Sequence, residues 1–332
     1  MNSDLRATLS VILPIFNEES VIPALFQALT PLLTSMSPSY EIICVNDGST
    51  DRSPFLLQAL AAQDQHIKII NFSRNFGHQM AITAGLDHSS GQAVLIMDAD
   101  LQDPPEILPQ FIAQWRQGYE VVYAVRRGRK EGLWKRLAYA VFYRTMKAMA
   151  DINVPLDAGD FCLLDRCVVD VLVALPERHR FLRGLRSWVG FRQIGIEYER
   201  GARHSGAPKY TLRQLIRLAL AGYIGFSSMP LHAAGWLGFF TSGLGAVLTL
   251  WALVTKMLGI PSPQGWASIL SVVLFMGGIQ LVMLGVVGEY LGRVYDEVRQ
   301  RPLYIVRSRV GFARADTTVA IHGTPTDITT ST

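Results

Sequence analysis

Two long stretches near the C-terminus contain no aspartate, glutamate, lysine or arginine. They are Leu231–Thr255, of 25 residues, and Ala267–Gly288, of 22 residues. A helix of either length can cross the hydrocarbon core of a bilayer, which is about 30 Å thick. A buried helical pair in a soluble protein is the weaker alternative, because such helices are usually shorter. The sequence therefore predicts a hairpin of two transmembrane helices, at about 231–255 and 267–289.

Basic residues flank this predicted hairpin on both sides. They are Arg213 and Arg217 before it and Arg293, Arg299, Arg301, Arg307 and Arg309 after it. Because cytoplasmic flanks of membrane helices are enriched in lysine and arginine, we expect the N-terminal domain and both termini to be cytoplasmic. The opening sequence, MNSDLRATLS, lacks the basic region and long apolar core of a signal peptide, which agrees with this topology. The prediction is a multi-pass protein of the cell inner (cytoplasmic) membrane.

The charge of the chain favours membrane lipids over nucleic acid as the anionic partner. The net charge is +4 and the isoelectric point is about 9.0, which is a modest basic excess. The segment Leu212–Tyr223 is predicted to form an amphipathic helix with its arginines at the level of the lipid headgroups, and a soluble surface helix is the alternative. Three cysteines, Cys44, Cys162 and Cys167, form no disulfide framework, so reduced cytosolic thiols are expected.

Apolar strand patterns and helical patterns alternate through the N-terminal part of the chain. The predicted strands are Leu9–Leu13, Glu41–Val45, Ile67–Asn71, Ala93–Met97 and Glu120–Val125. The predicted helices are Asn17 to about Leu33 with Ser20 as its cap, Ser53–Ala62, His78–His88 and Glu106–Gln117. Further along, helices are predicted at Leu133–Ala150 and Asp165–Leu175. This alternation indicates an α/β domain built on a parallel sheet.

Polar turns follow three of the predicted strands. They are Pro14–Glu19, Asn46–Asp51 and Asp98–Asp103. The carboxyl ends of parallel strands meet at one edge of a sheet, so these turns are expected to converge on one ligand-binding crevice. The chain has no GxxxxGK[ST] motif and no GxGxxG after its first strand, which disfavours P-loop and dinucleotide-binding folds.

The pair Asp98 and Asp100 directly follows the apolar strand at Ala93. Side chains alternate across an extended chain, so both carboxylates would point the same way and repel each other without a cation between them. Mg²⁺ or Mn²⁺ suits such oxygen ligands and commonly shares them with phosphate. A solvated acidic turn is the alternative for this motif on its own.

Five motifs occur in a fixed order through the N-terminal domain. They are PIFNEE (Pro14–Glu19), VNDGSTD (Val45–Asp51), NFSRNFGHQMAITAG (Asn71–Gly85), DADLQDPP (Asp98–Pro105) and GDFCLLDR (Gly159–Arg166). Near the membrane lie FSSMPL (Phe226–Leu231) and GEYLGRVYDEVRQRPLYIV (Gly288–Val306). Over about Leu9 to Val306, this set resembles the polyisoprenyl-phosphate glycosyltransferases of family 2. That group has the GT-A fold and includes dolichyl-phosphate mannose synthase and the bactoprenol glucosyltransferases.

The resemblance implies a domain organisation. Residues 1–210 would form a cytosolic GT-A (Rossmann-like) α/β domain with a mixed sheet. Residues 211–230 would form the amphipathic interface helix, and residues 231–291 the two transmembrane helices. Residues 292–332 would be a cytosolic C-terminal segment whose Thr-rich end, from Ala315, is expected to be disordered.

The resemblance also implies roles for individual residues. The metal ligands would be Asp98, Asp100 and Gln102, and the catalytic residues Asp160 and Asp100. The nucleotide-sugar would be held by Pro14, Phe16, Glu18, Asp47, Asp98 and Gln102. The lipid phosphate would be bound by Arg126, Arg129, Arg200, Arg203 and Lys209. For Arg126 and Arg129 the alternative is a solvated loop.

The implied reaction is a metal-dependent, inverting transfer of a hexose to polyprenyl (undecaprenyl) phosphate. Glucose from UDP-glucose is the first choice, and UDP-GlcNAc, UDP-galactose, GDP-mannose and an aminopentose donor stay open. A phosphate monoester has a second pKa of about 6 and is mostly anionic at pH 7, so Asp160 would either remove a residual proton or orient the acceptor. Two helices per chain are also compatible with a homo-oligomer.

Three positions depart from the pattern of that family. Cys162 stands where arginine is usual in GDFRL, Pro208 replaces a hydroxyl residue, and Ala221 replaces an acid. These changes affect the expected acceptor side and leave Asp98 and Asp100 intact. The rival functions are a processive polysaccharide synthase, which would need a longer membrane bundle and a QxxRW motif, and a non-catalytic membrane scaffold. A transporter is disfavoured because the predicted membrane helices carry no charge.

Overall fold

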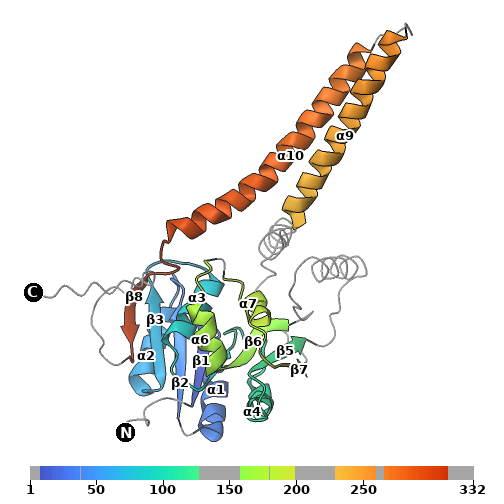
Figure 1. The fold of residues 1–332 in the computed structure, drawn as a ribbon. Helices are drawn as coiled ribbons and strands as arrows, with labels where there is room; N and C mark the ends of the chain where they lie inside the picture. The colour runs from blue at the N-terminus through green and yellow to red at the C-terminus, as the bar shows by residue number, and fades with distance from the viewer. Residues whose placement is uncertain are drawn as a thin grey trace, which may run out of the picture. The chain divides into compact units, whose positions relative to one another are not determined.

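The computed structural model describes residues 8–37, 39–126, 158–178, 180–198, 229–258 and 265–312. The chain divides into two compact units (Figure 1). The first unit comprises Met1–Tyr143, Ile152–Lys209 and Gln300–Thr332, and the second comprises Arg144–Asp151 and Tyr210–Arg299. The predicted helices at Leu133–Ala150 and Leu212–Tyr223, and the segment from Ala315 onward, lie outside the described residues.

The described part of the first unit is built on one mixed sheet. Its strands are β1 (Leu9–Ile15), β2 (Tyr40–Asn46), β3 (Ile67–Phe72), β4 (Ala93–Ile96), β5 (Val121–Arg126), β6 (Ala158–Asp165), β7 (Gln193–Tyr198) and β8 (Val306–Val310). Their order across the sheet is β7-β5-β6-β4-β1-β2-β3-β8. Strands β1 to β4 are parallel, whereas β6 is antiparallel to β4 and β5, and β8 is antiparallel to β3. The five strands predicted from the strand–helix alternation, β1 to β5, therefore run in one direction, and the antiparallel β6 and β8 make the sheet mixed, as the resemblance implies.

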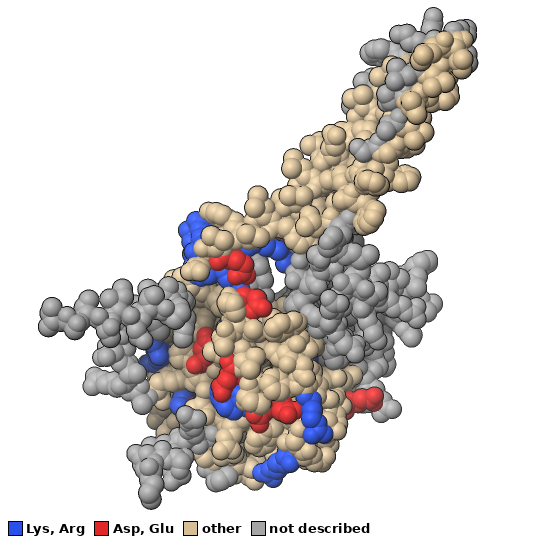
Figure 2. All heavy atoms as spheres, viewed as in Figure 1, with Lys and Arg blue, Asp and Glu red and all other residues tan. Residues whose placement is uncertain are grey.

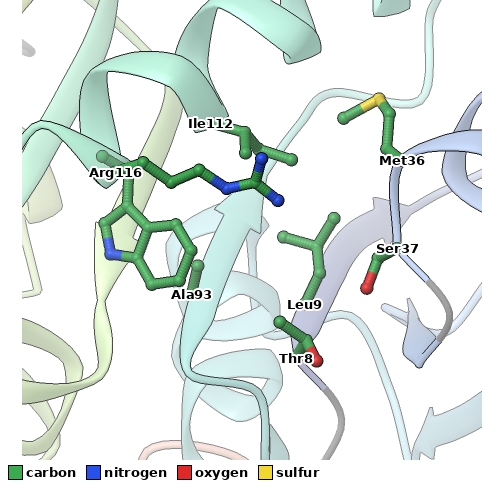
Figure 3. Close-up of a pocket in the computed structure, with 8 residues that line it drawn as sticks. Thr8, Leu9, Met36, Ser37, Ala93, Ile112 and Arg116 are labelled. Carbon is green, nitrogen blue, oxygen red and sulfur yellow. The ribbon is translucent and has the colours of Figure 1, made fainter.

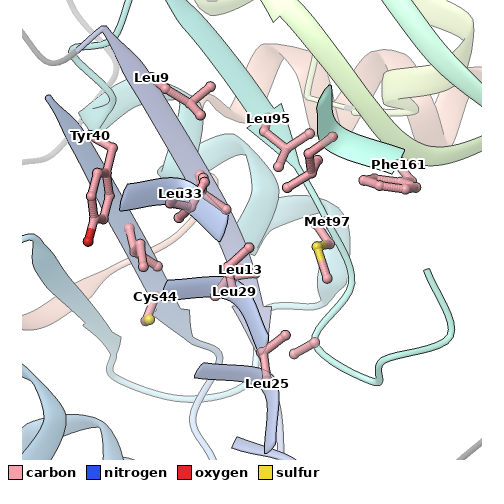
Figure 4. Packing of buried hydrophobic residues seen from close by; sticks show 14 of the residues in the cluster. Leu9, Leu13, Leu25, Leu29, Leu33, Tyr40, Cys44, Leu95, Met97 and Phe161 are labelled. Carbon is pink, nitrogen blue, oxygen red and sulfur yellow. The ribbon is translucent and has the colours of Figure 1, made fainter. Parts of the chain in front are cut away.

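Helices cover both faces of this sheet (Figure 1). They are α1 (Ile22–Met36), α2 (Ser53–Gln63), α3 (His78–His88), the 3-10 helix η1 (Pro105–Ile107), α4 (Leu108–Arg116), α6 (Arg166–Ala174) and α7 (Leu182–Trp188). Because successive side chains of a strand point to opposite faces, Val11 and Leu13 pack with α1, α2 and α4, while Ile12 packs with α3, α6 and α7. Figure 4 shows the first of these cores, in which Leu25, Leu29 and Leu33 of α1 pack against the strands.

Several of the predicted helix boundaries differ from the observed ones. Helix α1 begins only at Ile22, and its N-cap residue, Val21, makes no side-chain capping bond, so the prediction that Ser20 caps this helix is wrong. A proline in the first turn presets the backbone angle and lacks an N–H group that would need a partner. The predicted helix Glu106–Gln117 is divided into η1 and α4. Helix α6 begins at Arg166, because Asp165 is its N-cap and accepts a hydrogen bond from the Cys167 N–H.

The second unit contains two long helices, α9 (Met229–Met257) and α10 (Trp266–Arg299), which pack against each other. Among the described residues, Phe275–Arg299 is long and apolar enough to cross a membrane, judged by length and composition. Large apolar side chains on both helices are exposed, among them Trp236 (72%), Phe239 (75%) and Phe275 (68%). Figure 2 shows that most of this surface carries no charged side chain. Soluble proteins rarely expose an apolar surface of this extent, so the second unit is suited to a bilayer.

Residues after α10 belong to the first unit, where β8 pairs with β3. Before this strand, the Tyr304 ring stacks on Phe72 with 5.1 Å between ring centroids. Its hydroxyl donates to Asp87 Oδ2 of α3 at 2.6 Å. The segment between α10 and β8 is therefore anchored to both the sheet and α3.

A buried glutamate joins three strands of the first unit with the loop before β4. Glu41 in β2 is 2% exposed. It accepts hydrogen bonds from Ser10 Oγ (2.5 Å), Lys68 Nζ (2.6 Å) and the Ser90 N–H (2.7 Å). Burial alone would raise the pKa of Glu41, but these bonds outweigh it and the pKa is lowered. The ionised carboxylate therefore stabilises the fold.

Replacing Glu41 with glutamine is expected to lower the free energy of unfolding at pH 7 by about 1–3 kcal/mol, because buried donors lose their ionised partner. Since the fold lowers this pKa, the contribution is present above the unfolded value of about 4.5 and is lost as the pH falls through the folded value. Denaturant unfolding at several pH values tests this: the gap between wild type and Glu41→Gln should close in acid. Glu106→Gln, at an exposed position, is the control. A gap that is constant with pH would contradict the assignment.

Candidate active site

The register of β4 and β6 brings two separate acidic motifs together. The two strands are antiparallel, and Ile96 lies opposite Cys162. Asp98 lies two residues beyond the end of β4, and Asp160 lies two residues before Cys162 in β6. His78, the first residue of α3, bridges them: its Nε2 lies 3.4 Å from Asp98 Oδ1 and 3.6 Å from Asp160 Oδ2. Of these three residues, only Asp98 belongs to the polar turns expected to converge; His78 and Asp160 come from other segments.

Asp160 is 5% exposed and is surrounded by donors. Arg183 of α7 donates to it twice, from Nε to Oδ1 at 2.8 Å and from Nη2 to Oδ2 at 3.1 Å, and Gln79 Nε2 donates to Oδ2 at 3.2 Å. Burial would raise the pKa of Asp160, but contact with His78 and the charge of Arg183 outweigh it and hold the pKa well below its usual range. Such a carboxylate stays ionised at neutral pH and is a weak base. The catalytic role expected for Asp160 stays a prediction.

Asp98 has the opposite electrostatic environment. Burial raises its pKa to about 6, and the negative charges of Asp103, Asp160 and Asp100 add to this effect, while His78 opposes it. The pKa of His78 is itself raised, because its contact with Asp160 and the charge of Asp98 outweigh the effect of burial. Carboxylates that repel one another in this way are stabilised by an added cation.

The backbone between Asp100 and Gln102 is strained. Leu101 has a φ angle of +55°, in the left-handed region that costs a non-glycine residue about 1–3 kcal/mol. The Asp100 Oδ1 atom accepts a hydrogen bond from the Gln102 N–H at 3.1 Å, which helps to hold this turn. Gln102 is 7% exposed. Strain of this kind occurs mainly at functional sites, where surrounding contacts keep a loop in one geometry.

The turns after β1 and β2 are bonded to each other. The Asn17 N–H donates to Ser49 Oγ at 3.1 Å, the Glu18 N–H donates to Ser53 Oγ at 3.0 Å, and the Glu19 N–H donates to Asp51 Oδ2 at 3.1 Å. These hydrogen bonds hold the two turns together at the carboxyl ends of β1 and β2.

Asp47 holds the loop that leads into α3. Its carboxylate is buried and accepts hydrogen bonds from the backbone N–H groups of Phe76 (2.6 Å) and Gly77 (3.0 Å). The adjacent Gly48 has a φ angle of +69°, and a Cβ atom there would lie 2.5 Å from the carbonyl carbon of Arg74. Asp47 therefore holds the backbone directly before His78. Its contact with a nucleoside stays a prediction.

The other predicted ligand residues differ in accessibility. Pro14 is buried within β1, whereas Phe16 is 40% exposed on the turn that follows. Arg126 is the last residue of β5. The remaining predicted phosphate ligands, and two of the three departures from the family pattern, lie outside the described residues: Arg129, Arg200, Arg203, Lys209, Pro208 and Ala221.

A cavity of about 60 Å³ lies elsewhere in the first unit (Figure 3). Leu9 and Ala93, which begin β1 and β4, line it together with Met36 and Ile112. The acidic residues instead follow the carboxyl ends of these strands. The cavity is therefore separate from the candidate site.

Comparison with known proteins assigns the family. Residues 10–172 match the family described as "Glycosyl transferase family 2". The chain is also 46% identical over 303 residues to "Uncharacterized glycosyltransferase YkcC" of Bacillus subtilis, an alignment that covers 91% of this chain and 94% of the relative. The chain belongs to glycosyl transferase family 2. Its mixed sheet, with helices on both faces, is the GT-A fold of this family.

The C-terminal part of this family 2 chain matches a second description, "GtrB C-terminal hairpin", over residues 229–294. "SfII prophage-derived bactoprenol glucosyl transferase" of Shigella flexneri is 37% identical over 300 residues, covering 90% of this chain and 97% of the relative. A solved structure of glucosyl-3-phosphoglycerate synthase from Mycobacterium tuberculosis with Mn²⁺, uridine-diphosphate-glucose and phosphoglyceric acid is 22% identical. Its TM-score is 0.45, and 66% of this chain and 79% of that chain are covered. The sequence matches thus extend over both units of the chain.

The donor atoms near Asp98 suit a hard divalent cation. Asp98 and Asp100 supply carboxylate oxygens and Gln102 an amide oxygen, which are the ligands that Mg²⁺ and Mn²⁺ prefer. Among the described residues, no group of three or more histidine, cysteine, aspartate or glutamate side chains is arranged to hold a metal. Burial raises the pKa of Asp98 and nearby carboxylates raise it further, and this accumulation of negative charge favours a cation here.

Three residues of this family 2 site were not among the predicted ligands or catalytic residues. His78 and Gln79 contact Asp160 from the first turn of α3, and Arg183 contacts it from α7. The signal for the first two was the motif NFSRNFGHQMAITAG, which contains both. Arg183 is one of several arginines in its segment, and only the packing of α7 on β6 distinguishes it.

Proposed function

We propose that this family 2 glycosyl transferase moves a hexose from a nucleotide diphosphate to a polyprenyl phosphate at the cytoplasmic membrane face. The observation that carries this proposal is the extent of the match to the bactoprenol glucosyl transferase of Shigella flexneri, which includes both the acidic site and the hairpin. An enzyme that uses a lipid acceptor needs its catalytic groups held near a bilayer, and the apolar hairpin meets that need.

The donor would lie at the edge of the sheet where β1, β2 and β4 end. Phe16 is exposed there and can stack against a nucleobase, with Glu18 and Asp47 nearby. Asp98, Asp100 and Gln102 would hold Mg²⁺ or Mn²⁺, which when bound neutralises charge on a diphosphate leaving group. The turn between Asp100 and Gln102, in which Leu101 has a positive φ angle, would help to bring these three residues to the cation.

The acceptor would need little proton removal. A phosphate monoester is mostly anionic at pH 7 because its second pKa is about 6. This agrees with an Asp160 whose pKa is held low by its neighbours. Asp160 would orient the acceptor through Arg183 and His78, and Arg126, Arg129, Arg200, Arg203 and Lys209 are the proposed ligands of the lipid phosphate. A single displacement by the phosphate oxygen would invert the anomeric centre.

Glucose from UDP-glucose is the proposed substrate, because relatives that match over 90% of the chain are named as glucosyl transferases. Both helices of the hairpin would span the inner membrane, with the first unit and both termini in the cytoplasm, as the flanking arginines favour. The domain limits proposed above, with the interface helix at 211–230, complete this topology. A homo-oligomer through the hairpin is compatible with it.

The test is transfer of radiolabelled sugar to undecaprenyl phosphate by the full-length protein in membranes. A panel of UDP-glucose, UDP-galactose, UDP-GlcNAc and GDP-mannose is supplied with Mg²⁺ or Mn²⁺. We expect a labelled lipid from UDP-glucose, and its loss when EDTA removes the metal. Re-addition of metal after EDTA is the control for irreversible damage.

Each outcome has a separate meaning. A labelled lipid from another donor would overturn the choice of glucose and keep the reaction. Transfer that is unaffected by EDTA would overturn the metal assignment. No labelled lipid from any donor, with the protein folded, would favour the non-catalytic scaffold.

A further inference from the structure

One arginine of α7, the helix that carries Arg183, is completely buried. Arg186, on α7, is 0% exposed, and its guanidinium packs over the Tyr123 ring with 5.0 Å to the ring centroid. Its Nη1 atom is 3.5 Å from the Gly159 carbonyl oxygen, which makes at best a weak hydrogen bond. Arginine is rarely fully buried unless it is paired, so this position requires an explanation.

The guanidinium of Arg186 has an incomplete set of partners. Within the described part of the chain, its Nε and Nη2 atoms are buried and have no hydrogen-bond partner. Leaving a buried donor unsatisfied costs about 1–3 kcal/mol, and more when the group is charged. Packing alone does not account for such a residue, because an apolar side chain of the same length would fill the space without this cost.

Cys162 is the immediate neighbour of this cation. Cys162 is also 0% exposed, and it lies opposite Tyr123 in β5 and Ile96 in β4. Burial raises the pKa of its thiol, while the charge and hydrogen bond of Arg186 oppose that rise. Cys162 is therefore the side chain of β6 that interacts with the guanidinium of Arg186.

Cys162 and the active-site residue Asp160 are close neighbours on one strand. Asp160 precedes Cys162 by two residues in β6, so both side chains point to the face covered by α7. On α7, Arg183 precedes Arg186 by three residues, which puts both on one side of that helix. Arg183 pairs with Asp160. Arg186, one turn further along α7, contacts the carbonyl of Gly159, the residue before Asp160.

We propose that Arg186 is a positioning residue that fixes, from α7, the part of β6 that carries Asp160, and that Cys162 and Arg186 form one coupled unit. The guanidinium holds the Gly159 carbonyl, one residue before Asp160 in β6, and thereby keeps Asp160 aligned with Arg183 of the same helix. In this arrangement Arg186 supplies, from another element, a guanidinium beside the position where arginine is usual in the family pattern.

The first experiment separates charge from packing and uses full-length Arg186→Met and Arg186→Lys. Methionine fills the space without a charge, and lysine keeps the charge. For Arg186→Met we expect an unfolding temperature equal to or above that of wild type, because a poorly paired buried cation is removed. We expect its kcat for sugar transfer to fall about 10-fold with little change in donor KM, and Arg186→Lys to retain more of the kcat than Arg186→Met. This readout rests on the proposed function.

The second experiment tests the coupling of the two residues. Cys162→Arg alone would put two guanidinium groups into one pocket, and we expect it to lower both the unfolding temperature and the transfer rate. The swap, Cys162→Arg combined with Arg186→Met, should recover most of both losses, because the effects of residues that form one unit do not add. The matched control is Cys167→Arg, at an exposed position, with and without Arg186→Met.

The results that overturn the proposal are specific. If Arg186→Met lowers stability and activity together, and Arg186→Lys is no better, the residue has a packing role only. If the effects of Cys162→Arg and Arg186→Met simply add, the two side chains are not one unit. A wild-type protein without transfer activity would instead overturn the proposed function, and the recovery of unfolding temperature in the swap would still decide whether the two residues are coupled.

Discussion

Replacing Asp98 with asparagine is expected to lower the rate of sugar transfer by about 100- to 1,000-fold, the usual cost of removing one group that stabilises charge at a reacting centre. Asparagine keeps the size of the side chain and removes the negative charge. The charge matters because Asp98 lies where the acidic turn after β4 meets Asp160 and His78. Without it, the proposed cation site loses a carboxylate ligand. Initial rates at saturating donor and acceptor measure the effect.

The same substitution is not expected to destabilise the fold. Burial and neighbouring negative charges raise the pKa of Asp98 to about 6, so its ionisation at neutral pH opposes folding. A neutral side chain removes that penalty, and the unfolding temperature of Asp98→Asn should equal or exceed that of wild type. Glu106→Gln, an exposed position in the same segment, is the control and should change neither value. Inactivity that comes with a lower unfolding temperature would contradict a direct role for Asp98.

The parts of the site that could be predicted from sequence are those encoded within single motifs. An apolar strand followed at once by Asp98 and Asp100 implies an acidic group at a strand end, and the structure has one. The contact of Asp98 with the group around Asp160 depends on β6, which runs antiparallel to β4. The sequence of β6 does not indicate that β4 is its neighbour, because the pairing of strands that are distant in sequence depends on how the whole sheet packs.

Edge strands and helix starts were the least predictable parts of the fold. Strand β8, with the sequence VRSRV, has only two apolar residues and follows a long apolar helix, so its pattern suggests a surface segment. It forms because Tyr304 and the edge of β3 hold it. The start of α1 was placed too early because Ser20 resembles a cap, whereas the N–H groups of Asn17 to Glu19 are instead bonded to side chains of the next turn.

Replacing Tyr304 with alanine is expected to lower the free energy of unfolding of the first unit by about 3–5 kcal/mol, the usual cost of removing a buried aromatic ring. Tyr304 is 5% exposed, stacks on Phe72 and donates to Asp87. In a unit of this size, the loss corresponds to a fall in unfolding temperature of about 10 °C. Tyr304→Phe keeps the ring and removes only the hydroxyl, so it should cost about 1–3 kcal/mol. Arg307→Ala, at an exposed position of β8, is the control.

The transfer activity of these variants tests whether Tyr304 also affects the position of α3. Asp87, its partner, lies near the end of α3, and the first turn of the same helix carries His78 and Gln79 at the site. A helix transmits a shift at one end to the other because its backbone is rigid over three turns. If Tyr304 only secures the edge of the sheet, Tyr304→Phe retains full transfer activity well below its unfolding temperature. A loss of kcat under those conditions would show that the return segment after α10 also sets the position of α3, and hence the alignment of His78 with Asp98 and Asp160.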